Sequence, residues 1–292
     1  MTYKECMAKF GSDKPDLRIP NEIQDVYYAD DAKFSKALWF QKSQINQQIS
    51  KSAMKKFVKE VKELFSNHKL TIIEHEISEH SGKILEKVLP TDTDLKGQIG
   101  DLGFIVQGGQ EIIVQECLGK IRTFFSEKYL DLDPEVLKFL WVVDFPLFLP
   151  NPENGKLEAA HHPFTRPVDE DLKILKSNPE KVRAQHYDLV LNGQEIGGGS
   201  MRIHESDLQE FILKDILCED TKELCHMLEA LRYGCPPHGG IALGLDRIMM
   251  IIRKAKSIRD VIAFPKTANG KDLMSGAPSL IRQEEKDYYH LK

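Results

Sequence analysis

Three consecutive glycines stand between two opposite charges in the stretch LNGQEIGGGSMRIH, residues 191–204. Glu195 precedes the glycines and Arg202 follows them. Glycine is a poor strand and helix former, and its missing side chain lets other groups approach the backbone closely. The stretch is therefore either a loose loop or a place where something must lie against the backbone.

The dipeptide Asn192-Gly193, which lies between DLVL and QEIGG, predicts a two-residue type I′ hairpin turn. Strict pairing from this turn gives the following partners: Leu191 with Gln194, Val190 with Glu195, and Asp188 with Gly197. Side chains two residues apart share a face of a strand, so Asp188 and Glu195 are expected on the same side as diagonal neighbours.

Two like charges on one face destabilise a bare sheet, and two explanations remain open. Asp188 and Glu195 either point to solvent and are screened, or bind Mg²⁺, which commonly uses one or two carboxylates together with substrate phosphates. Strict alternation places Arg202 on the opposite face from Glu195. Arg202 is either a surface cation or part of a site shared with Glu195, and a shared site requires a bulge or bend within the glycine run.

A histidine pair, His161 and His162, opens the motif HHPFTRP and stands directly before a proline. The proline favours an extended conformation for His162. Neighbouring side chains in extended backbone point to opposite sides, so the two imidazoles are not expected to hold one metal ion together. They either form hydrogen bonds with a substrate or have no role in a site.

The motif GGIALGLDR, residues 239–247, predicts a strand that leads into a helix beginning near Asp246. Gly240, Ala242 and Gly244 alternate along one side, which leaves that face flat enough for a planar ring or for close packing of another strand. Arg247 lies in the first turn of the helix. The helix dipole disfavours a cation there unless an anion such as phosphate neutralises both.

Residues 22–128 contain the elements of a compact α+β module. The apolar spacing predicts a helix over 52–67, a strand over 69–78, a second strand over 100–109, and a helix that includes 112–125. The first helix has a lysine-rich outer face, which is either solvated or a specific contact for a nucleic acid.

Residues 129–292 mix strands and helices without regular alternation, which favours an α+β fold with an antiparallel sheet. We expect a strand over 139–150, a helix over 169–177, the hairpin described above, and two helices over 206–217 and 221–234. Ser206 is a candidate N-cap for the first of these helices, and Gly234 is a candidate stop for the second.

Composition narrows the class of protein. The chain has 292 residues, of which 41% are hydrophobic and 29% charged, as in an ordinary globular protein. No apolar run reaches about 18 residues, so no transmembrane helix or membrane partner is expected. The net charge of −5 argues against a broadly cationic surface. The odd number of cysteines without CxxC pairing favours free thiols in a reducing compartment: Cys6, Cys117, Cys218, Cys225 and Cys235.

Taken together, several motifs in order resemble one family. GGIALGLDR resembles motif 3 of class II aminoacyl-tRNA synthetases, with Ala242 where the class often has glycine. FGSDKPDLR, WVVDFPLF, HHPFT, YDLVLNGQEIGGGSMRIH and RDVIAFPK are similar to the bacterial and mitochondrial aspartyl-tRNA synthetases, and phrases such as VVDFPLFLP look closer to the animal mitochondrial type. The resemblance covers almost the whole chain except residues 22–128, which stand where the family has its insertion domain.

The resemblance implies a fold and a division into domains. Residues 1–21 would be a catalytic-core segment, residues 22–128 the insertion domain, and residues 129–292 the catalytic core with motif 3. The core would be the class II antiparallel sheet flanked by helices. The ligands would be ATP, Mg²⁺, L-aspartate and tRNA(Asp), the full-length protein would be a homodimer, and its location would be the mitochondrial matrix.

The resemblance also assigns residues to roles. Arg202 would hold the side-chain carboxylate of aspartate and contact ATP, Asp188 and Glu195 would bind Mg²⁺, and His161 and His162 would lie beside the amino acid and the tRNA end. Two further sets are implied. The pocket floor would include Gly197, Gly198, Gly199 and Ser200. The ATP site would include Glu195, Gly240, Gly244, Leu245, Asp246 and Arg247.

The chain departs from the family by what it does not contain. It has no FRxE sequence of motif 2, no motif 1 and no anticodon-binding domain. We therefore expect a C-terminal fragment with an incomplete sheet, an exposed edge and apolar surface, which is inactive by itself. Two functions compete: an aspartate–tRNA ligase to which this chain contributes part of the site, and a non-catalytic remnant that acts as a binding or dimerisation module.

Overall fold

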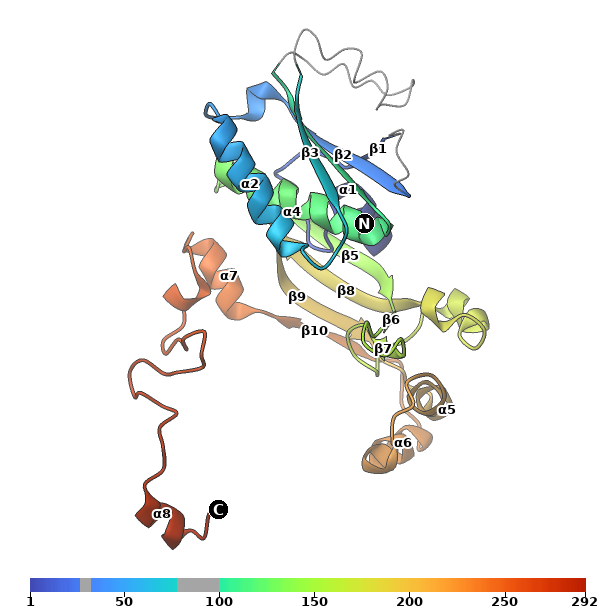
Figure 1. Cartoon of the computed structure of the whole chain (residues 1–292). Coiled ribbons are helices and arrows are strands. Elements are labelled where there is room, and N and C mark those ends of the chain that lie inside the picture. The colour runs from blue at the N-terminus through green and yellow to red at the C-terminus, as the bar shows by residue number, and fades with distance from the viewer. Residues whose placement is uncertain (27–32, 78–99) are drawn as a thin grey trace. The chain divides into compact units, whose positions relative to one another are not determined.

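The computed structural model describes residues 1–26, 33–77 and 100–292. The chain divides into two compact units, Met1–Ala242 and Leu243–Lys292, and each is described by itself. Figure 1 labels the helices and strands along the chain. The first unit contains two four-stranded sheets with antiparallel pairing, in agreement with the predicted α+β class.

The first sheet has the strand order β1-β2-β4-β3, and all of its pairs are antiparallel. Its strands and the two helices that pack on it are β1 (Gln24–Asp25), β2 (Phe34–Phe40), α2 (Lys51–Leu64), β3 (Thr71–Glu76), β4 (Leu102–Gly108) and α4 (Glu111–Tyr129). The predicted helices and strands of this region are confirmed, except that residue 78 lies outside the described residues.

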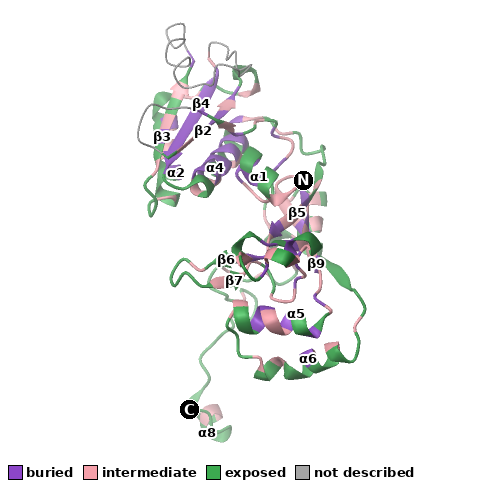
Figure 2. Cartoon of the chain, turned by 90° about the vertical axis from the view of Figure 1, so that its right-hand side faces the viewer, coloured by how far each residue is buried: buried purple, intermediate pink, exposed green. Residues whose placement is uncertain are grey.

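The central strand β4 is buried at every position, and its alternating residues serve two cores. Phe104 and Val106 join the main core with α2 and α4, whereas Ile105 joins a smaller cluster with Val26 and Ala37 on the other face. β4 and much of α4 are accordingly coloured as buried in Figure 2. Four phenylalanine rings lie 4.4–6.2 Å apart at the centre of the main core: Phe40, Phe57, Phe104 and Phe125.

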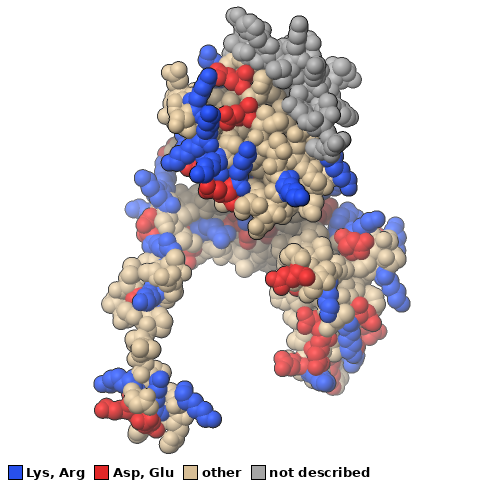
Figure 3. Space-filling model, viewed as in Figure 1, with Lys and Arg blue, Asp and Glu red and all other residues tan. Residues whose placement is uncertain are grey.

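The lysines of α2 are exposed, as the sequence predicts. Lys55, Lys59 and Lys62 line a shallow groove against Ile72, Ile73 and Glu74 of β3. Figure 3 shows lysine side chains projecting where α2 lies in Figure 1. This exposure agrees with both alternatives, a solvated face and a tRNA contact, so the tRNA contact stays a prediction.

The second sheet has the strand order β10-β9-β8-β5. Its strands are β5 (Phe139–Pro146), β8 (Arg183–Leu191), β9 (Gln194–Met201) and β10 (Gly239–Leu243). On one face, Val142 and Val190 pack with Cys6 of helix α1 (Tyr3–Phe10). On the other face, Phe139 and Trp141 are 56% and 49% exposed, so the expected apolar surface is present.

The edge strand β5 is partly paired by the first residues of the chain. Thr2 forms a parallel bridge with Val143, and the amino group of Met1 donates to the carbonyl of Trp141 over 2.9 Å. Thr2 also caps α1, because its side chain accepts from the N–H of Glu5. Residues 1 and 2 therefore cover part of the edge that was expected to be exposed.

Two predicted elements of this region differ from the structure. The strand expected over 139–150 is divided into β5 and β6 (Phe148–Pro150), and β6 pairs with β7 (Leu157–Ala159). The pairing of β5 shifts between Val143 and Phe145, where Asp144 has a φ of 56°. The helix expected over 169–177 is a shorter 3-10 helix, Asp169–Ile174.

The helices after β9 also differ in detail. Residues 206–217 form α5 (Ser206–Phe211) and a π-helical turn, and residues 221–234 form a 3-10 turn and α6 (Cys225–Arg232). Ser206 as an N-cap is wrong, because Ser206 is the first helical residue and its Oγ instead donates to the carbonyl of Leu228 over 2.9 Å. Gly234, with a φ of 106°, follows the end of α6 as predicted.

The second unit contains α7 (Leu245–Ile252), a 3-10 turn and α8 (Gln283–Tyr288). The five cysteines are free, and Cys6 and Cys117 are buried. Among the described residues, none of the helices has the length and apolar character that crossing a membrane requires.

Among the residues that the structure describes, the largest fully buried side chain is that of Arg122 on α4. Its guanidinium donates to the carbonyls of Asn21 over 2.8 Å and Asp16 over 2.9 Å, and also to that of Ile19. Burial lowers the pKa of Arg122 to about 10, although the nearby acidic groups act against this shift. The same guanidinium lies 4.6 Å from the centre of the Phe10 ring. Arg122 thus fixes residues 16–21 against α4.

We predict that Arg122→Met lowers the free energy of unfolding by about 2–4 kcal/mol, because three buried carbonyl groups lose their donors. Denaturant unfolding measures this loss. The control Lys120→Met changes an exposed residue of the same helix and should cost less than about 0.5 kcal/mol. Equal stability of the two variants would contradict the structural role of Arg122.

Candidate functional site

The β8–β9 hairpin has the predicted turn. Asn192 and Gly193 have φ angles of 49° and 82°, as a type I′ turn requires. The first two pairs are also as predicted, Leu191 with Gln194 and Val190 with Glu195. The Asn192 side chain accepts from the N–H of Lys138 over 2.9 Å and so ties the turn to the start of β5.

The register changes immediately after these pairs. Leu189 pairs with Gly197 and Asp188 with Gly198, which leaves Ile196 as an extra residue in β9. The expected pair of Asp188 with Gly197 is therefore wrong by one residue. The cause is a β-bulge, in which two residues of one strand stand opposite one residue of its partner.

The bulge reverses which residues of β9 lie on the same face. Glu195 faces the same side as Asp188 and, beyond Ile196, so do Gly198 and Ser200. The alternation continues to Arg202, which forms an antiparallel bridge with Thr165 just after β9. The register break required for a shared site is therefore present, although it lies at Ile196, one residue before the glycines.

The glycines meet different neighbours. A Cβ on Gly198 would lie 2.6 Å from Oδ1 of Asp188 and 3.3 Å from Oε1 of Glu195, so both carboxylates converge over this bare position. A Cβ on Gly199 would lie 1.9 Å from the carbonyl oxygen of Gly240 in β10. Gly198 therefore leaves room for the carboxylates, whereas Gly199 lets two strands approach closely.

The carboxylate pair is a candidate cation site that offers only two side-chain ligands. Asp188 is buried, and its Oδ1 lies 3.0 Å from Nε2 of His186. Within the described ranges, no three His, Cys, Asp or Glu side chains gather as metal ligands. Asp188 and Glu195 alone fit an ion that takes its remaining ligands from water or from phosphates, as Mg²⁺ commonly does.

Arg202 lies on the same face of the sheet as Asp188 and Glu195, and one of its guanidinium nitrogens has no acceptor among the described residues. Its backbone N–H donates to the carbonyl of His238 over 2.8 Å. Its Nη1 atom is buried and has no hydrogen-bond partner among the residues that the structure describes. A buried guanidinium nitrogen without an acceptor costs free energy, so an anionic ligand at this point would be stabilising.

The two predicted histidines have separate surroundings. His161 stacks on His186 with ring centres 3.8 Å apart and planes 10° apart, and Phe145 contacts both rings edge-on at 4.9 Å. His162 instead accepts from the N–H of Phe164 over 3.2 Å. Desolvation lowers the pKa of both imidazoles, and a further lowering comes from His186 at His161 and from Arg202 at His162.

His186 was missed from the sequence, although one signal was available. It stands two residues before Asp188 on a predicted strand, and that spacing places both side chains on one face. Its stacking partner His161 is 25 residues earlier in the chain, and no local pattern connects them.

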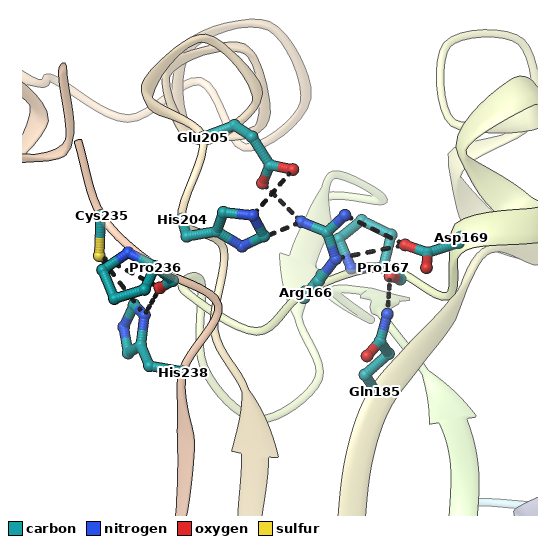
Figure 4. Close-up of polar contacts among 9 residues, drawn as sticks. All are labelled: Arg166, Pro167, Asp169, Gln185, His204, Glu205, Cys235, Pro236 and His238. Atoms are coloured by element: carbon teal, nitrogen blue, oxygen red, sulfur yellow. Dashed lines mark hydrogen bonds and ion pairs between the residues drawn. The ribbon is translucent and has the colours of Figure 1, made fainter.

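An ion-pair cluster holds the histidine segment against the end of β9. Nε and Nη2 of Arg166 donate to Asp169 over 3.2 and 3.1 Å, and Nη1 donates to Glu205 (Figure 4). The backbone N–H of Arg166 also donates to the carbonyl of Met201 over 2.9 Å. On the other flank, Figure 4 shows Cys235 and the carbonyl of Pro236 close to His238. Arg202 is thus fixed from two sides.

The predicted ATP residues fall in both units. Gly240 belongs to β10, and a Cβ there would meet nothing within 4 Å. Gly244, Leu245, Asp246 and Arg247 belong to the second unit, where Gly244 precedes α7 and Arg247 stands in its first turn as predicted. Their part in the site stays a prediction.

A comparison with family models identifies the class of protein. The model described as "tRNA synthetases class II (D, K and N)" matches residues 1–268. The chain therefore belongs to the class II tRNA synthetases of this group.

Curated relatives of the chain within this group are aspartate–tRNA ligases. Along its whole length the chain is 43% identical to "Aspartate--tRNA ligase, mitochondrial" of Mus musculus, covering 48% of that protein. It is 38% identical to "Aspartate--tRNA(Asp/Asn) ligase" of Caldanaerobacter subterraneus, covering 52%. The chain thus spans about half the length of these curated relatives. A solved aspartyl-tRNA synthetase from Entamoeba histolytica matches 69% of the chain and 44% of its own, at 18% identity with a TM-score of 0.36.

We predict a graded effect of adding one methyl group along the sheet. Gly199→Ala should lower the free energy of unfolding most, by about 1–3 kcal/mol, because its Cβ meets the backbone of Gly240. Gly198→Ala should cost less, because the Asp188 side chain can move away, but it displaces that carboxylate. The control Gly240→Ala has open space. Denaturant unfolding ranks the three variants, and an inverted order would contradict the described strand contact.

We predict that His161 contributes a pH-dependent part of stability. Its folded pKa is lowered, so the unfolded chain takes up a proton first as the pH falls below about 6.5. The contribution is therefore present above that pH and is lost between the unfolded and the folded pKa. Unfolding measured at pH 8 and pH 5.5 should show a smaller decline for His161→Asn than for the unchanged chain. An equal decline would show that His161 does not contribute.

Proposed function

We propose that this chain contributes part of the amino-acid and ATP site of an aspartate–tRNA ligase. The observation that carries the proposal is the face formed by the bulge at Ile196. On this face, a buried Arg202 nitrogen without a described partner accompanies the carboxylates of Asp188 and Glu195. The Arg202 cation suits the acidic side chain of aspartate. The two carboxylates suit a metal ion that is bound to the nucleotide. The relatives named above support the same activity.

Arg202 would bind the side-chain carboxylate of aspartate. A planar guanidinium offers two parallel N–H donors to a carboxylate, which a lysine ammonium cannot do. The backbone of Arg202 is held by a bridge to Thr165 and by a hydrogen bond to the carbonyl of His238, so the base of the side chain is fixed before the ligand arrives. This arrangement favours aspartate over asparagine, because a neutral amide cannot neutralise the charge of a guanidinium whose Nη1 atom is buried without an acceptor among the described residues.

Asp188 and Glu195 would hold Mg²⁺ together with ATP phosphates. A bound Mg²⁺ supplies positive charge that neutralises the phosphates. The aspartate α-carboxylate oxygen would attack the ATP α-phosphorus, and the bond to pyrophosphate would break. A ribose hydroxyl at the tRNA end would then take the acyl group from the aspartyl adenylate, with release of AMP. The protein mainly positions the reactants and stabilises charge in such a reaction.

The other predicted residues complete the proposed site. His161 and His162 would lie beside the amino acid and the tRNA end, and Gly197, Gly198, Gly199 and Ser200 would form the pocket floor. Gly240, Gly244, Leu245, Asp246 and Arg247 would contact ATP, with the Arg247 cation beside the phosphates.

Partners and location follow from the same proposal. The relatives of animal origin are mitochondrial, which supports the mitochondrial matrix as the location. The proposed partners are aspartate, ATP and tRNA(Asp), and the full-length protein would form a homodimer.

The alternative function is a non-catalytic binding or dimerisation module. The exposed Phe139 and Trp141 on one face of the second sheet favour it. Pairing of Met1 and Thr2 with β5 weighs against recruitment of another chain at that part of the edge. Binding of aspartate by the chain separates the two functions.

We predict that Arg202→Lys weakens binding of L-aspartate by at least about tenfold, or about 1.4 kcal/mol, because the two-donor contact with the carboxylate is lost. Calorimetric titration or ligand-observed NMR of the 292-residue chain measures this without requiring turnover. The control Arg232→Lys makes the same exchange at a surface residue that pairs with Glu210. Equal affinity in all three proteins would remove Arg202 from the site. Absence of binding to the unchanged chain would favour the alternative function.

A further inference from the structure

His186 contacts two of the proposed site residues at once. We propose that His186 is a positioning residue, which fixes the Asp188 carboxylate and the His161 imidazole in the orientations needed for aspartate activation. The inference rests on the proposed function, but its two contacts are features of the structure by themselves.

The first contact is a hydrogen bond to Asp188. Nε2 of His186 lies 3.0 Å from Oδ1 of Asp188, and the two side chains are only 11% and 10% exposed. The same Oδ1 lies 2.6 Å from where a Cβ of Gly198 would be. Oδ1 is therefore held between the imidazole and the glycine backbone, and Oδ2 is the oxygen through which Asp188 would bind a cation.

This contact has a physical reason. Asp188 and Glu195 converge over Gly198, and two carboxylates so placed repel each other. A donor on Asp188 Oδ1 opposes rotation of the carboxylate away from its neighbour. Hydrogen-bond partners behind a metal ligand are known to set its orientation in this way.

The second contact is the stack on His161. The ring centres are 3.8 Å apart and the planes differ by 10°, while Phe145 closes the edge of both rings at 4.9 Å. His161 lies in a segment without regular secondary structure, so its backbone does not fix its side chain. The flat face of His186 restricts the His161 ring to one plane.

Because the two contacts use different properties of the imidazole, two substitutions can separate them. His186→Phe keeps a flat ring against His161 but cannot donate to Asp188. His186→Gln places a donor nitrogen at a similar reach but has no ring. His186→Ala removes both contacts, and His226→Gln on the exposed face of α6 is the control.

The 292-residue chain is titrated with Mn²⁺ alone by electron paramagnetic resonance, and NMR follows the ring signals of His161 and the carboxyl carbon of Asp188. We expect His186→Phe to weaken Mn²⁺ binding by about tenfold and to shift the Asp188 signal. The His161 signals should stay displaced from those of a free histidine. In His186→Gln, Mn²⁺ binding should remain close to that of the unchanged chain, and the His161 signals should move toward those of a free histidine.

Three outcomes would overturn the proposal. His186→Ala could leave the Mn²⁺ affinity and both sets of NMR signals unchanged. The Phe and Gln variants could change both readouts in parallel with a loss of thermal stability, which would show a merely structural role. The unchanged chain could also show no displacement of the His161 signals. If the unchanged chain binds no Mn²⁺, the proposed cation site fails, while the Asp188 and His161 signals still decide whether His186 positions them.

Discussion

The one-residue bulge at Ile196 is the constraint on which the candidate site depends. In a regular strand, Glu195 and Arg202 would face opposite sides of the sheet, because successive side chains alternate. The extra residue reverses this relation, so an anion and a cation seven positions apart lie on one face. A site for ligands of both charges can form here only because the backbone departs from regular pairing.

Close contacts in the segment that follows the bulge give the candidate site its shape. Gly198 leaves space for two carboxylates, and Gly199 lets β10 approach β9 so that His238 can accept from the backbone of Arg202. On the other flank, the Arg166 cluster ties the histidine segment to the end of β9. The backbone that carries Arg202 is therefore held by contacts on two flanks, as preorganised binding sites require.

The two sheets of the first unit differ in how they are buried. The first sheet and its helices share one hydrophobic core with aromatic rings at its centre, drawn from described residues between 23 and 130, which supports the proposed insertion domain as a module with its own stability. Arg122 fixes residues 16–21 to this module through three carbonyl groups. The second sheet is buried less completely, and its apolar residues Phe139 and Trp141 remain exposed in a chain that spans about half the length of its curated relatives.

The sequence by itself determined the family, the α+β class, the elements of residues 22–128 and the Asn192-Gly193 turn, because ordered motifs, apolar spacing and turn chemistry are local signals. It also indicated that Glu195 and Arg202 could share a site only if the register broke. Tertiary structure alone decided that the break lies at Ile196, that His186 stacks on His161, and that Ser206 bonds to α6 instead of capping a helix. These features depend on partners distant in the chain, and their free energy comes from packing and hydrogen bonds that form only when the chain folds.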